Sequence, residues 1–497
     1  MKLKTLFKNI PNVSIKGSKE TYISGICANS KLVSPGNLFI ARKGKTYNGH
    51  NFIPEALAAG AAALLTNIYN PFIKHTVQII HPHIEEIESL VANRYFNSPS
   101  QELETIAITG TNGKTTCAYL IKHIFDSLNS PCGLISTIEY IIGSQHHQSV
   151  RTTPDLITNY KLLRDMLKQG CSCAVMEVSS HALDQNRTQG ISYDFAIFTN
   201  LTQDHLDYHE NMETYCKAKA KLFTSLQESD TQSSPPIAII NADDPWHKLL
   251  LKNYRGNTCF FSIENQSDLQ AKNISLHAEN TEFDIFYKGN KVHFSSPLIG
   301  RHNVYNCLAS IAPALLKGTT LETLASIVKR FSLIPGRLQA VPNDLGIHIY
   351  IDYAHTPNAL YNVLESLREF KERKIITVFG CGGNRDRGKR PEMARIAEEL
   401  SDINIITSDN PRDEDPLEIC KAICQGFTSK KPYYIETDRY KAIKKAIELA
   451  ETKDLILIAG KGHEKQQTFS RKTIPFNDHK IASELCIQKT NKISQSH

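Results

Sequence analysis

Residues 103–116 read Leu-Glu-Thr-Ile-Ala-Ile-Thr-Gly-Thr-Asn-Gly-Lys-Thr-Thr, an apolar strand that runs into a short loop with two glycines and a lysine. A helix is predicted next, because apolar residues recur at helical spacing over residues 118–128. The backbone N–H groups of such a loop can wrap an anion, and the helix N-terminus adds partial positive charge. Lys114 can reach the β- and γ-phosphates, and Thr115 can bind Mg²⁺. The stretch predicts a nucleoside triphosphate site in an α/β fold.

The loop is shorter than a complete P-loop. That pattern has glycine where this chain has Ile108, so the match is to the form Gly-x-x-Gly-Lys-[Ser/Thr]. An ordinary glycine-rich turn could give the same match by itself. The strand before the loop and the helix after it favour phosphate binding.

Composition sets broad limits. The chain has 497 residues, which at about 150 residues per domain indicates about three domains. It is 41% hydrophobic and 22% charged, as in globular soluble proteins. The net charge of +6 is not gathered into a basic run, so we expect no nucleic-acid partner.

The sequence predicts neither a membrane span nor a secretory signal. The longest apolar run, 56–65, is broken by Gly60 and is too short to span a membrane, and the N-terminus lacks the apolar stretch of a secretory signal. Twelve cysteines are scattered without a disulfide framework, which indicates a reducing compartment. We therefore expect a cytoplasmic protein without a membrane span, and a monomer.

The order of patterns along the chain predicts an α/β protein of three domains. Residues 1–98 are mixed, with turn signals around short strands such as 38–41. Residues 99–333 alternate helices with apolar strands at 173–178, 194–200 and 236–241, which is typical of a mainly parallel sheet. Residues 334–497 begin after Ile334-Pro335-Gly336-Arg337 and repeat that alternation.

The third region carries polar clusters at its strand ends. Strands are predicted at 347–351, 374–380, 403–407, 433–437 and 455–459. All but the fourth lead directly into a cluster: Asp352-Tyr353-Ala354-His355-Thr356-Pro357, Gly380-Cys381-Gly382-Gly383-Asn384-Arg385-Asp386, Ser408-Asp409-Asn410-Pro411-Arg412 and Gly460-Lys461-Gly462-His463-Glu464. Because ligands of open α/β sheets bind beyond the carboxyl ends of the strands, these clusters should converge on one crevice.

Two polar segments end strands in the middle region. Glu177 of Glu177-Val178-Ser179-Ser180-His181 is an oxygen donor placed where a second Mg²⁺ ligand is needed, and His205 in the segment 200–209 is a further possible ligand. The same residues could instead cap helices or satisfy loop backbone groups. Either segment alone leaves both interpretations open.

Taken together, the motifs resemble those of the Mur ligase family, over essentially the whole chain. The match includes the ATP loop at 110–116, the Mg²⁺ segments at 177–181 and 200–209, and the third-domain signature at 352–357. The resemblance implies a UDP-binding N-terminal domain of mixed α/β structure, a central P-loop-type ATPase domain and a Rossmann-like C-terminal domain that binds the amino acid. Asp409-Asn410-Pro411-Arg412 is similar to the motif of the branch that adds diaminopimelate, whereas lysine-adding relatives differ at the arginine position.

The activity that this resemblance implies is an ATP-dependent ligation. It would join meso-2,6-diaminopimelate to the D-glutamyl γ-carboxylate of UDP-N-acetylmuramoyl-L-alanyl-D-glutamate through an acyl phosphate, with ATP and Mg²⁺ as cofactors, in peptidoglycan precursor synthesis. Because the implied sites lie on different domains, closure is expected, with Pro335-Gly336-Arg337 as its hinge.

The resemblance also assigns residues. Lys114, Lys219, His205 and Glu177 would be catalytic, with Thr115, Glu177, His205 and Lys219 holding the metal, the lysine as an anionic carbamate. ATP would contact Gly110, Thr111, Asn112, Gly113, Lys114, Thr115, Thr116, Asn303, Asn306 and Arg337. The UDP-muramoyl-dipeptide would contact Ser30, Thr152, Thr153, Ser179, Gln185 and Arg187, and diaminopimelate would contact Arg385, Asp409, Asn410, Pro411, Arg412, Gly460 and Glu464.

Four positions depart from the family pattern. Asn29-Ser30-Lys31 replaces the usual Asp-Ser-Arg, His302 stands where phenylalanine is common, and Asn384 replaces an aspartate.

Two alternatives remain at this point: a folylpolyglutamate synthetase, which would not be expected to carry Asp409-Asn410-Pro411-Arg412, and a nucleotide-dependent switch that holds ATP without turnover. The set Glu177, His205 and Lys219 argues against a switch.

Overall fold

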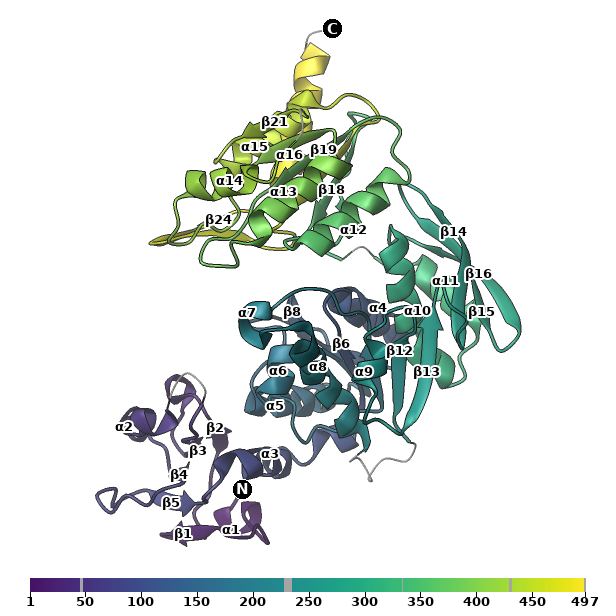
Figure 1. Cartoon of the computed structure of the whole chain (residues 1–497). Coiled ribbons are helices and arrows are strands. Elements are labelled where there is room, and N and C mark those ends of the chain that lie inside the picture. The colour runs from purple at the N-terminus through teal and green to yellow at the C-terminus, as the bar shows by residue number, and fades with distance from the viewer. Residues whose placement is uncertain (45–47, 228–234, 333, 429–430, 496–497) are drawn as a thin grey trace.

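The computed structural model describes residues 1–44, 48–227, 235–332, 334–428 and 431–495. Three α/β domains follow one another along the chain, as Figure 1 shows from purple at the N-terminus to yellow near the C-terminus. Each is built around its own sheet, so the expected three-domain α/β architecture is confirmed. Within the described residues, no helix combines the length and apolar character needed to cross a membrane.

The N-terminal domain has a mixed five-stranded sheet in the order β1-β5-β4-β3-β2. Strand β1 runs antiparallel to β5, and the other neighbouring strands are parallel. Its elements are α1 (Leu3–Leu6), β1 (Ser14–Lys16), β2 (Gly25–Cys27), η1 (Ser30–Leu32), β3 (Asn37–Ile40), η2 (Gly49–Phe52), α2 (Ile53–Ala58), β4 (Ala63–Thr66), β5 (Val77–Ile80) and α3 (Ile84–Tyr95).

The central domain has an eleven-stranded sheet in the order β16-β15-β14-β13-β12-β11-β6-β10-β7-β8-β9. The seven strands from β14 to β7 are parallel, as the alternation of strands and helices predicts. The strands are β6 (Glu104–Thr109), β7 (Cys132–Ile135), β8 (Glu139–Ile142), β9 (Gln145–Gln148), β10 (Cys173–Glu177), β11 (Phe195–Phe198), β12 (Ile237–Asn241), β13 (Asn257–Ser262), β14 (Leu269–Leu276), β15 (Thr281–Tyr287) and β16 (Asn290–Ser296). The antiparallel additions at the two ends of the sheet, β8 and β9 beyond β7 and β15 and β16 beyond β14, are not predicted from the sequence pattern.

Helices cover both faces of this sheet. Helix α4 follows the phosphate loop, as predicted, and its apolar stripe is buried together with one face of α10. The helices are η3 (Pro99–Gln101), α4 (Lys114–Ser127), α5 (Leu156–Lys168), α6 (Ser180–Asp184), α7 (Leu206–His209), α8 (Met212–Gln227), α9 (His247–Leu250), α10 (Arg301–Leu316) and α11 (Leu321–Lys329).

The C-terminal domain has a six-stranded sheet in the order β17-β18-β22-β19-β20-β21, in which only β17 is antiparallel to its neighbour. All five strands predicted in this region are present. The elements are β17 (Gln339–Ala340), β18 (His348–Asp352), α12 (Pro357–Arg368), β19 (Ile375–Phe379), α13 (Lys389–Leu400), β20 (Ile403–Ile406), α14 (Pro416–Cys424), β21 (Tyr433–Ile435), α15 (Arg439–Leu449), β22 (Leu455–Ala459), the hairpin β23 (Gln466–Phe469) and β24 (Lys472–Pro475), and α16 (Asp478–Gln495).

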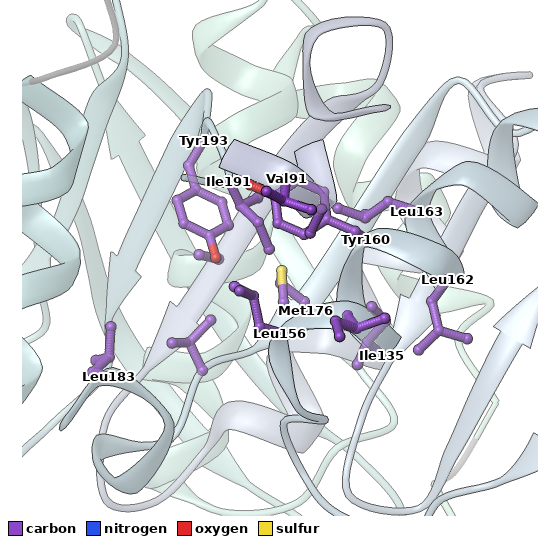
Figure 2. Packing of buried hydrophobic residues seen from close by; sticks show 14 of the residues in the cluster. Val91, Ile135, Leu156, Tyr160, Leu162, Leu163, Met176, Leu183, Ile191 and Tyr193 are labelled. Carbon is purple, nitrogen blue, oxygen red and sulfur yellow. The ribbon is translucent and has the colours of Figure 1, made fainter. Parts of the chain in front are cut away.

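An apolar core joins the first two domains. Figure 2 shows Val91 of α3 among Tyr160 and Leu163 of α5, with Ile191 and Tyr193 beside them. All five side chains are buried, and burial of an apolar side chain of this size contributes about 1.5–3 kcal/mol. Helix α3 is therefore held against the central domain by the same force that builds each domain's interior.

The third domain contacts the phosphate loop through polar groups. Asn112 Nδ2 in that loop donates to Asn358 Oδ1 in α12 at 3.1 Å, and Arg337 Nη2 donates to Thr115 Oγ1 at 3.3 Å. Farther away, the Tyr350 hydroxyl donates to the carbonyl of Ala278 at 2.8 Å. The C-terminal domain thus meets the central domain at the predicted ATP site.

All twelve cysteines are free thiols, and all but Cys424 are buried. This agrees with the absence of a disulfide framework in the sequence.

Candidate active site

Two glycines give the phosphate loop its shape. Gly110 has a φ of +151° and Gly113 a φ of +89°, a region that disfavours side chains. A Cβ on Gly110 would overlap Thr199 Oγ1, and one on Gly113 would overlap Asn306 Oδ1. Glycine is therefore required at both positions by packing as well as by backbone conformation.

The loop is fixed by the end of the neighbouring strand β11. Thr111 N donates to the carbonyl of Asn200 at 2.9 Å, and Asn112 N donates to Asn200 Oδ1 at 2.9 Å. Thr199 Oγ1 donates to the carbonyl of Asn112 at 2.7 Å. These contacts hold the backbone of the loop in one conformation, which is the pre-organisation that a phosphate-binding loop needs.

Two lysines, the half-buried Lys114 and the buried Lys219, point at the same part of the loop. Lys114 Nζ donates to the carbonyls of Gly110 and Thr111, both at 2.8 Å. Lys219 Nζ in α8 donates to the carbonyl of Gly110 at 2.8 Å and lies 4.5 Å from the centre of the Tyr215 ring. Burial lowers the pKa of both amines, and the charge of Lys114 lowers that of Lys219 further, well below its usual value. The structure thus brings the two predicted catalytic lysines together.

Glu177, at the end of β10, is completely buried beside the loop. Thr137 donates to its carboxylate twice, from the backbone N at 2.9 Å and from Oγ1 at 3.0 Å. The Thr137 hydroxyl also lies 3.0 Å from Thr152 Oγ1. This chain of contacts connects a predicted metal ligand with a residue of the predicted muramoyl-dipeptide site.

His205 lies in a group of aromatic side chains at the start of α7. Its backbone is left-handed, with a φ of +55°, and its ring centre is 4.9 Å from that of His181 and 6.1 Å from that of Tyr215. Tyr215 OH and Thr111 Oγ1 are 3.2 Å apart, so this group borders the phosphate loop. Across the described part of the chain, no three His, Cys, Asp or Glu side chains form a ready metal site.

Four of the residues predicted to hold the muramoyl-dipeptide form one hydrogen-bonded group. Thr153 Oγ1 donates to the carbonyl of Glu177 at 2.8 Å and accepts from Ser179 N at 3.0 Å. Arg187 donates from Nη1 to the carbonyl of Thr153 at 3.0 Å, and from Nη2 to Gln185 Oε1 at 2.6 Å. Ser30 lies apart from this group, in the first domain, where its hydroxyl donates to Glu55 Oε2 at 2.7 Å.

Two of the predicted ATP-binding residues, Asn303 and Asn306, lie on the first turns of α10. Asn306 Nδ2 donates to Asn303 Oδ1 at 2.8 Å, and Asn303 Nδ2 donates to the carbonyl of Ile299 at 2.8 Å. Both asparagines are buried, and Asn306 also packs against Gly113. Thr116 is buried on α4, one residue after Thr115.

Arg337 connects the loop to the third domain. Besides its contact with Thr115, its guanidinium lies 4.9 Å from the centre of the Tyr353 ring. Its Nε is buried and has no hydrogen-bond partner within the described residues. A buried donor without a partner beside a phosphate loop fits an anionic ligand.

The strand-end clusters of the third domain converge, as expected. A Cβ on Gly460 would lie 2.6 Å from Asp409 Oδ2, and one on Gly380 would overlap the carbonyl of Thr407. Gly460 N donates to the carbonyl of Asp352 at 3.1 Å. The ends of β18, β19, β20 and β22 therefore meet at one place.

Where these strand ends meet, Asn410 and Glu464 form a hydrogen-bonded polar group with Lys461. Asn410 Nδ2 donates to Glu464 Oε2 at 2.8 Å, and Lys461 Nζ donates to the same oxygen at 2.6 Å and to Asn410 Oδ1 at 3.1 Å. Lys461 is completely buried. The sequence motif 460–464 contains this lysine but does not indicate a role for it, because its contact with Asn410 depends on the fold.

The two predicted carboxylate-binding arginines flank Gly382. Arg412 Nη1 donates to the carbonyl of Gly383 at 2.8 Å, and a Cβ on Gly382 would lie 2.8 Å from that nitrogen and 3.6 Å from Arg385 Cγ. Arg412 has a left-handed backbone with a φ of +52° and follows Pro411. Arg385 is exposed.

The structure shows what three of the four departing side chains do, those of Asn29, Asn384 and His302. Asn29 Oδ1 accepts from Lys31 N at 3.1 Å, a cap that aspartate would also make. Asn384 has a φ of +53°, a conformation that asparagine tolerates well. His302 Nδ1 and Ser366 Oγ are 3.3 Å apart, so this ring joins α10 to α12.

Three family models match the chain in order. Their descriptions are Mur ligase family, catalytic domain, over residues 22–103; Mur ligase middle domain, over 108–314; and Mur ligase, glutamate ligase domain, over 336–462. Together they cover most of the described structure.

Individual proteins are similar over nearly the full length. A UDP-N-acetylmuramoyl-L-alanyl-D-glutamate--2,6-diaminopimelate ligase from Chlamydia felis is 41% identical over 490 residues, which cover 98% of this chain and 99% of that protein. A solved structure of a ligase with the same name is 31% identical with a TM-score of 0.71, and the match covers 99% of both chains. A MurF ligase from Thermotoga maritima, solved in complex with ADP, shares the fold at 19% identity and a TM-score of 0.63, over 95% of this chain and 98% of that one.

Proposed function

The chain belongs to the Mur ligase family, and within it we propose that this protein adds meso-2,6-diaminopimelate to UDP-N-acetylmuramoyl-L-alanyl-D-glutamate for peptidoglycan synthesis. The observation that carries the proposal is the pairing of two features in one chain. One is a phosphate loop with Glu177 and Lys219 beside it, and the other is a convergence of strand ends that includes Asp409-Asn410-Pro411-Arg412. Near-full-length relatives of that name support the assignment.

The chemistry begins with activation of a carboxylate. A carboxylate does not accept an amine at neutral pH, so the γ-carboxylate oxygen of the D-glutamyl residue attacks the γ-phosphorus of ATP and ADP leaves. The amine of diaminopimelate then attacks the acyl carbon of the acyl phosphate, loses a proton and expels inorganic phosphate. Lys114, anchored at the phosphate loop, places positive charge where charge builds on the transferring phosphoryl group.

We propose that Mg²⁺ is held by Thr115, Glu177, His205 and a carbamate on Lys219. The donors fit a hard cation, because the hydroxyl, the carboxylate and the carbamate offer oxygen. When bound, the ion would neutralise phosphate charge. The low pKa of Lys219 supports the carbamate, since only a neutral amine reacts with CO₂.

The muramoyl-dipeptide site is proposed along the group of Thr152, Thr153, Ser179, Gln185 and Arg187, with the UDP end near Ser30 in the first domain. Its hydrogen bonds to Glu177 and Thr137 support this, because they connect the site with the phosphate loop where the carboxylate must react. Asn303, Asn306 and Arg337 are proposed to contact ATP.

The diaminopimelate site is proposed at Asp409, Asn410, Pro411, Gly460 and Glu464. Arg385 and Arg412 would hold its distal carboxylate through paired charge-assisted hydrogen bonds.

Gly336, in the proposed hinge, packs on the neighbouring loop: it has a φ of +69°, and a Cβ there would overlap the backbone at Gly462. The proposed domain limits are 1–98, 99–333 and 334–497.

A phosphate-release assay tests the proposal against its two alternatives. Purified protein with ATP and Mg²⁺ is expected to release phosphate only when both the UDP-linked dipeptide and diaminopimelate are present. Release that needs a folate and glutamate would indicate a folylpolyglutamate synthetase. Nucleotide binding without any acceptor-dependent release would indicate a switch.

A further inference from the structure

A completely buried ion pair lies beneath the proposed diaminopimelate pocket. It joins Arg439, the first residue of α15, to Asp478, the first residue of α16, two helices that Figure 1 shows next to each other. Arg439 Nε donates to Asp478 Oδ1 at 2.8 Å, and Nη2 donates to Oδ2 at 2.7 Å. Neither side chain has any exposed surface.

The same guanidinium also binds the ends of two strands. Nη2 donates to the carbonyl of Ala459 at 2.9 Å, and Nη1 donates to the carbonyl of Ser408 at 3.4 Å. Ala459 is the last residue of β22, and Ser408 lies just beyond the end of β20. The residues that follow these two carbonyls are Gly460 and Asp409, both in the proposed pocket.

The two strand ends have little room to move relative to each other. Asp409 Oδ2 is so close to Gly460 that a Cβ there would lie 2.6 Å from it, and Ser408 Oγ donates to the carbonyl of Thr437 at 2.7 Å, just before α15. A shift of either carbonyl would therefore change the spacing between Asp409 and Gly460.

Stability alone does not explain such a pair. Taking two charges out of water costs so much that apolar residues of similar volume are often equally stabilising or better. What an apolar pair cannot do is donate to two carbonyls on different strands. Lysine cannot do it either, because its ammonium is a point donor on a flexible stem rather than a planar fork.

We propose that Arg439, oriented by Asp478, is a positioning residue for recognition of the amino acid. It sets the relative position of the loops after β20 and β22, and so the geometry of Asp409, Asn410 and Gly460. This inference rests on the proposed function, because those residues are assigned to diaminopimelate there.

The test measures KM for each of the three substrates in two variants. Arg439→Lys retains the buried charge but loses the fork, and Arg439→Met combined with Asp478→Leu removes both charges together. In each we expect KM for diaminopimelate to rise about tenfold or more, since small misplacements of binding groups are costly. KM for ATP and for the UDP-linked dipeptide should stay within about twofold of the wild-type values.

Asp454→Asn is the matched control. Asp454 is also completely buried, but it lies at the opposite end of β22, where it accepts from Lys374 N at 3.1 Å and from Glu451 N at 2.9 Å. Its loss should lower the melting temperature without a selective change in KM for diaminopimelate. A selective rise in that control would show that any destabilisation of the sheet has this effect, and would overturn the proposal.

The remaining outcomes are also decisive. If the Met/Leu variant folds and its KM for diaminopimelate is unchanged, the proposal is wrong. It is also wrong if that variant cannot fold, because the pair would then serve the fold itself. Failure of the wild-type protein to ligate diaminopimelate would instead contradict the proposed function, so the two failures are distinguishable.

Discussion

The side-chain amines of Lys114 and Lys219 meet at one backbone oxygen, each donating a hydrogen bond of 2.8 Å to the carbonyl of Gly110. Two ammonium groups at this separation repel each other, and burial adds to the cost of charge. The pKa of Lys219 is therefore held well below its usual value. Of the two amines, the fold thus lowers the pKa of Lys219 the more strongly, which favours the neutral form that a carbamate requires.

Lys219→Ala should abolish ligation, and formate or acetate at high concentration should restore part of it by filling the anionic site. The loss should be at least about a hundredfold, since electrostatic groups at a transferring phosphate contribute about 3 kcal/mol or more. Lys217→Ala is the control: that lysine is on the same helix, exposed and paired with Glu213. An unmodified Lys219 in a high-resolution map of active, Mg²⁺-loaded protein would contradict the carbamate.

Lys114→Ala should leave the fold intact and lower the ligation rate by at least about a hundredfold, because the cation at the transferring phosphoryl group is lost. Circular dichroism and thermal melting check the fold, and phosphate release checks the rate. Lys122→Ala is the control on the same helix, where its Nζ pairs with Asp126. Turnover above about a tenth of the wild-type rate would remove this role from Lys114.

Arg412→Ala should raise KM for diaminopimelate much more than KM for ATP, because a guanidinium that pairs with the distal carboxylate acts only on that substrate. Steady-state kinetics with each substrate varied in turn provide the measurement. Arg395→Ala, an exposed arginine on α13, serves as the control. Equal rises in both KM values would show that Arg412 merely shapes its loop.

Glu88→Gln should change the pH dependence of stability: relative to the wild type, the variant should be more stable at pH 8 than it is at pH 5. Burial raises the pKa of Glu88 to about 7, against an opposing effect of Arg42, whose Nε lies 3.1 Å from the carboxylate. The folded chain holds this proton between pH 4.5 and 7 while the unfolded chain loses it, so wild-type stability falls as pH rises through that window, by up to about 3 kcal/mol. Melting temperatures across the window should show a shallower fall in the variant. Melting temperatures that fall equally with pH in Glu88→Gln and in the wild type would contradict this. Glu86→Gln is the control, because Glu86 is exposed on the same helix.

Much of the fold follows from local pattern. Apolar runs that end in polar clusters predicted the parallel strands β6, β10, β11 and β12, because a strand buried on both faces must be apolar throughout. Strands β14 to β16, at one end of the sheet, have less regular apolar patterns, such as the exposed and half-buried residues 272–274, so pattern did not distinguish them from loops. Strands β15 and β16 depend on antiparallel pairing, whereas β14 also pairs in parallel with β13.

The candidate site likewise contains residues that local sequence pattern predicts and residues that it does not. Lys114 and Glu177 are predictable because strand-to-helix transitions and strand ends place them. Lys219 is, from pattern alone, an ordinary helix lysine; its burial against Gly110 exists only in the folded chain. Arg439 and Asp478 are 39 residues apart, and no local signal connects them.

The proposed function depends most on the third domain, whose converging strand ends we expect to select diaminopimelate for addition to the UDP-linked dipeptide. The most direct test offers the unmutated protein equal amounts of meso-diaminopimelate and L-lysine, with ATP, Mg²⁺ and UDP-N-acetylmuramoyl-L-alanyl-D-glutamate, and identifies the UDP-linked tripeptide by mass spectrometry. A site that pairs with a carboxylate can reject the analogue that lacks it by up to about 10⁴, so the diaminopimelate product should dominate. Incorporation of L-lysine as efficiently as meso-diaminopimelate would contradict the claim.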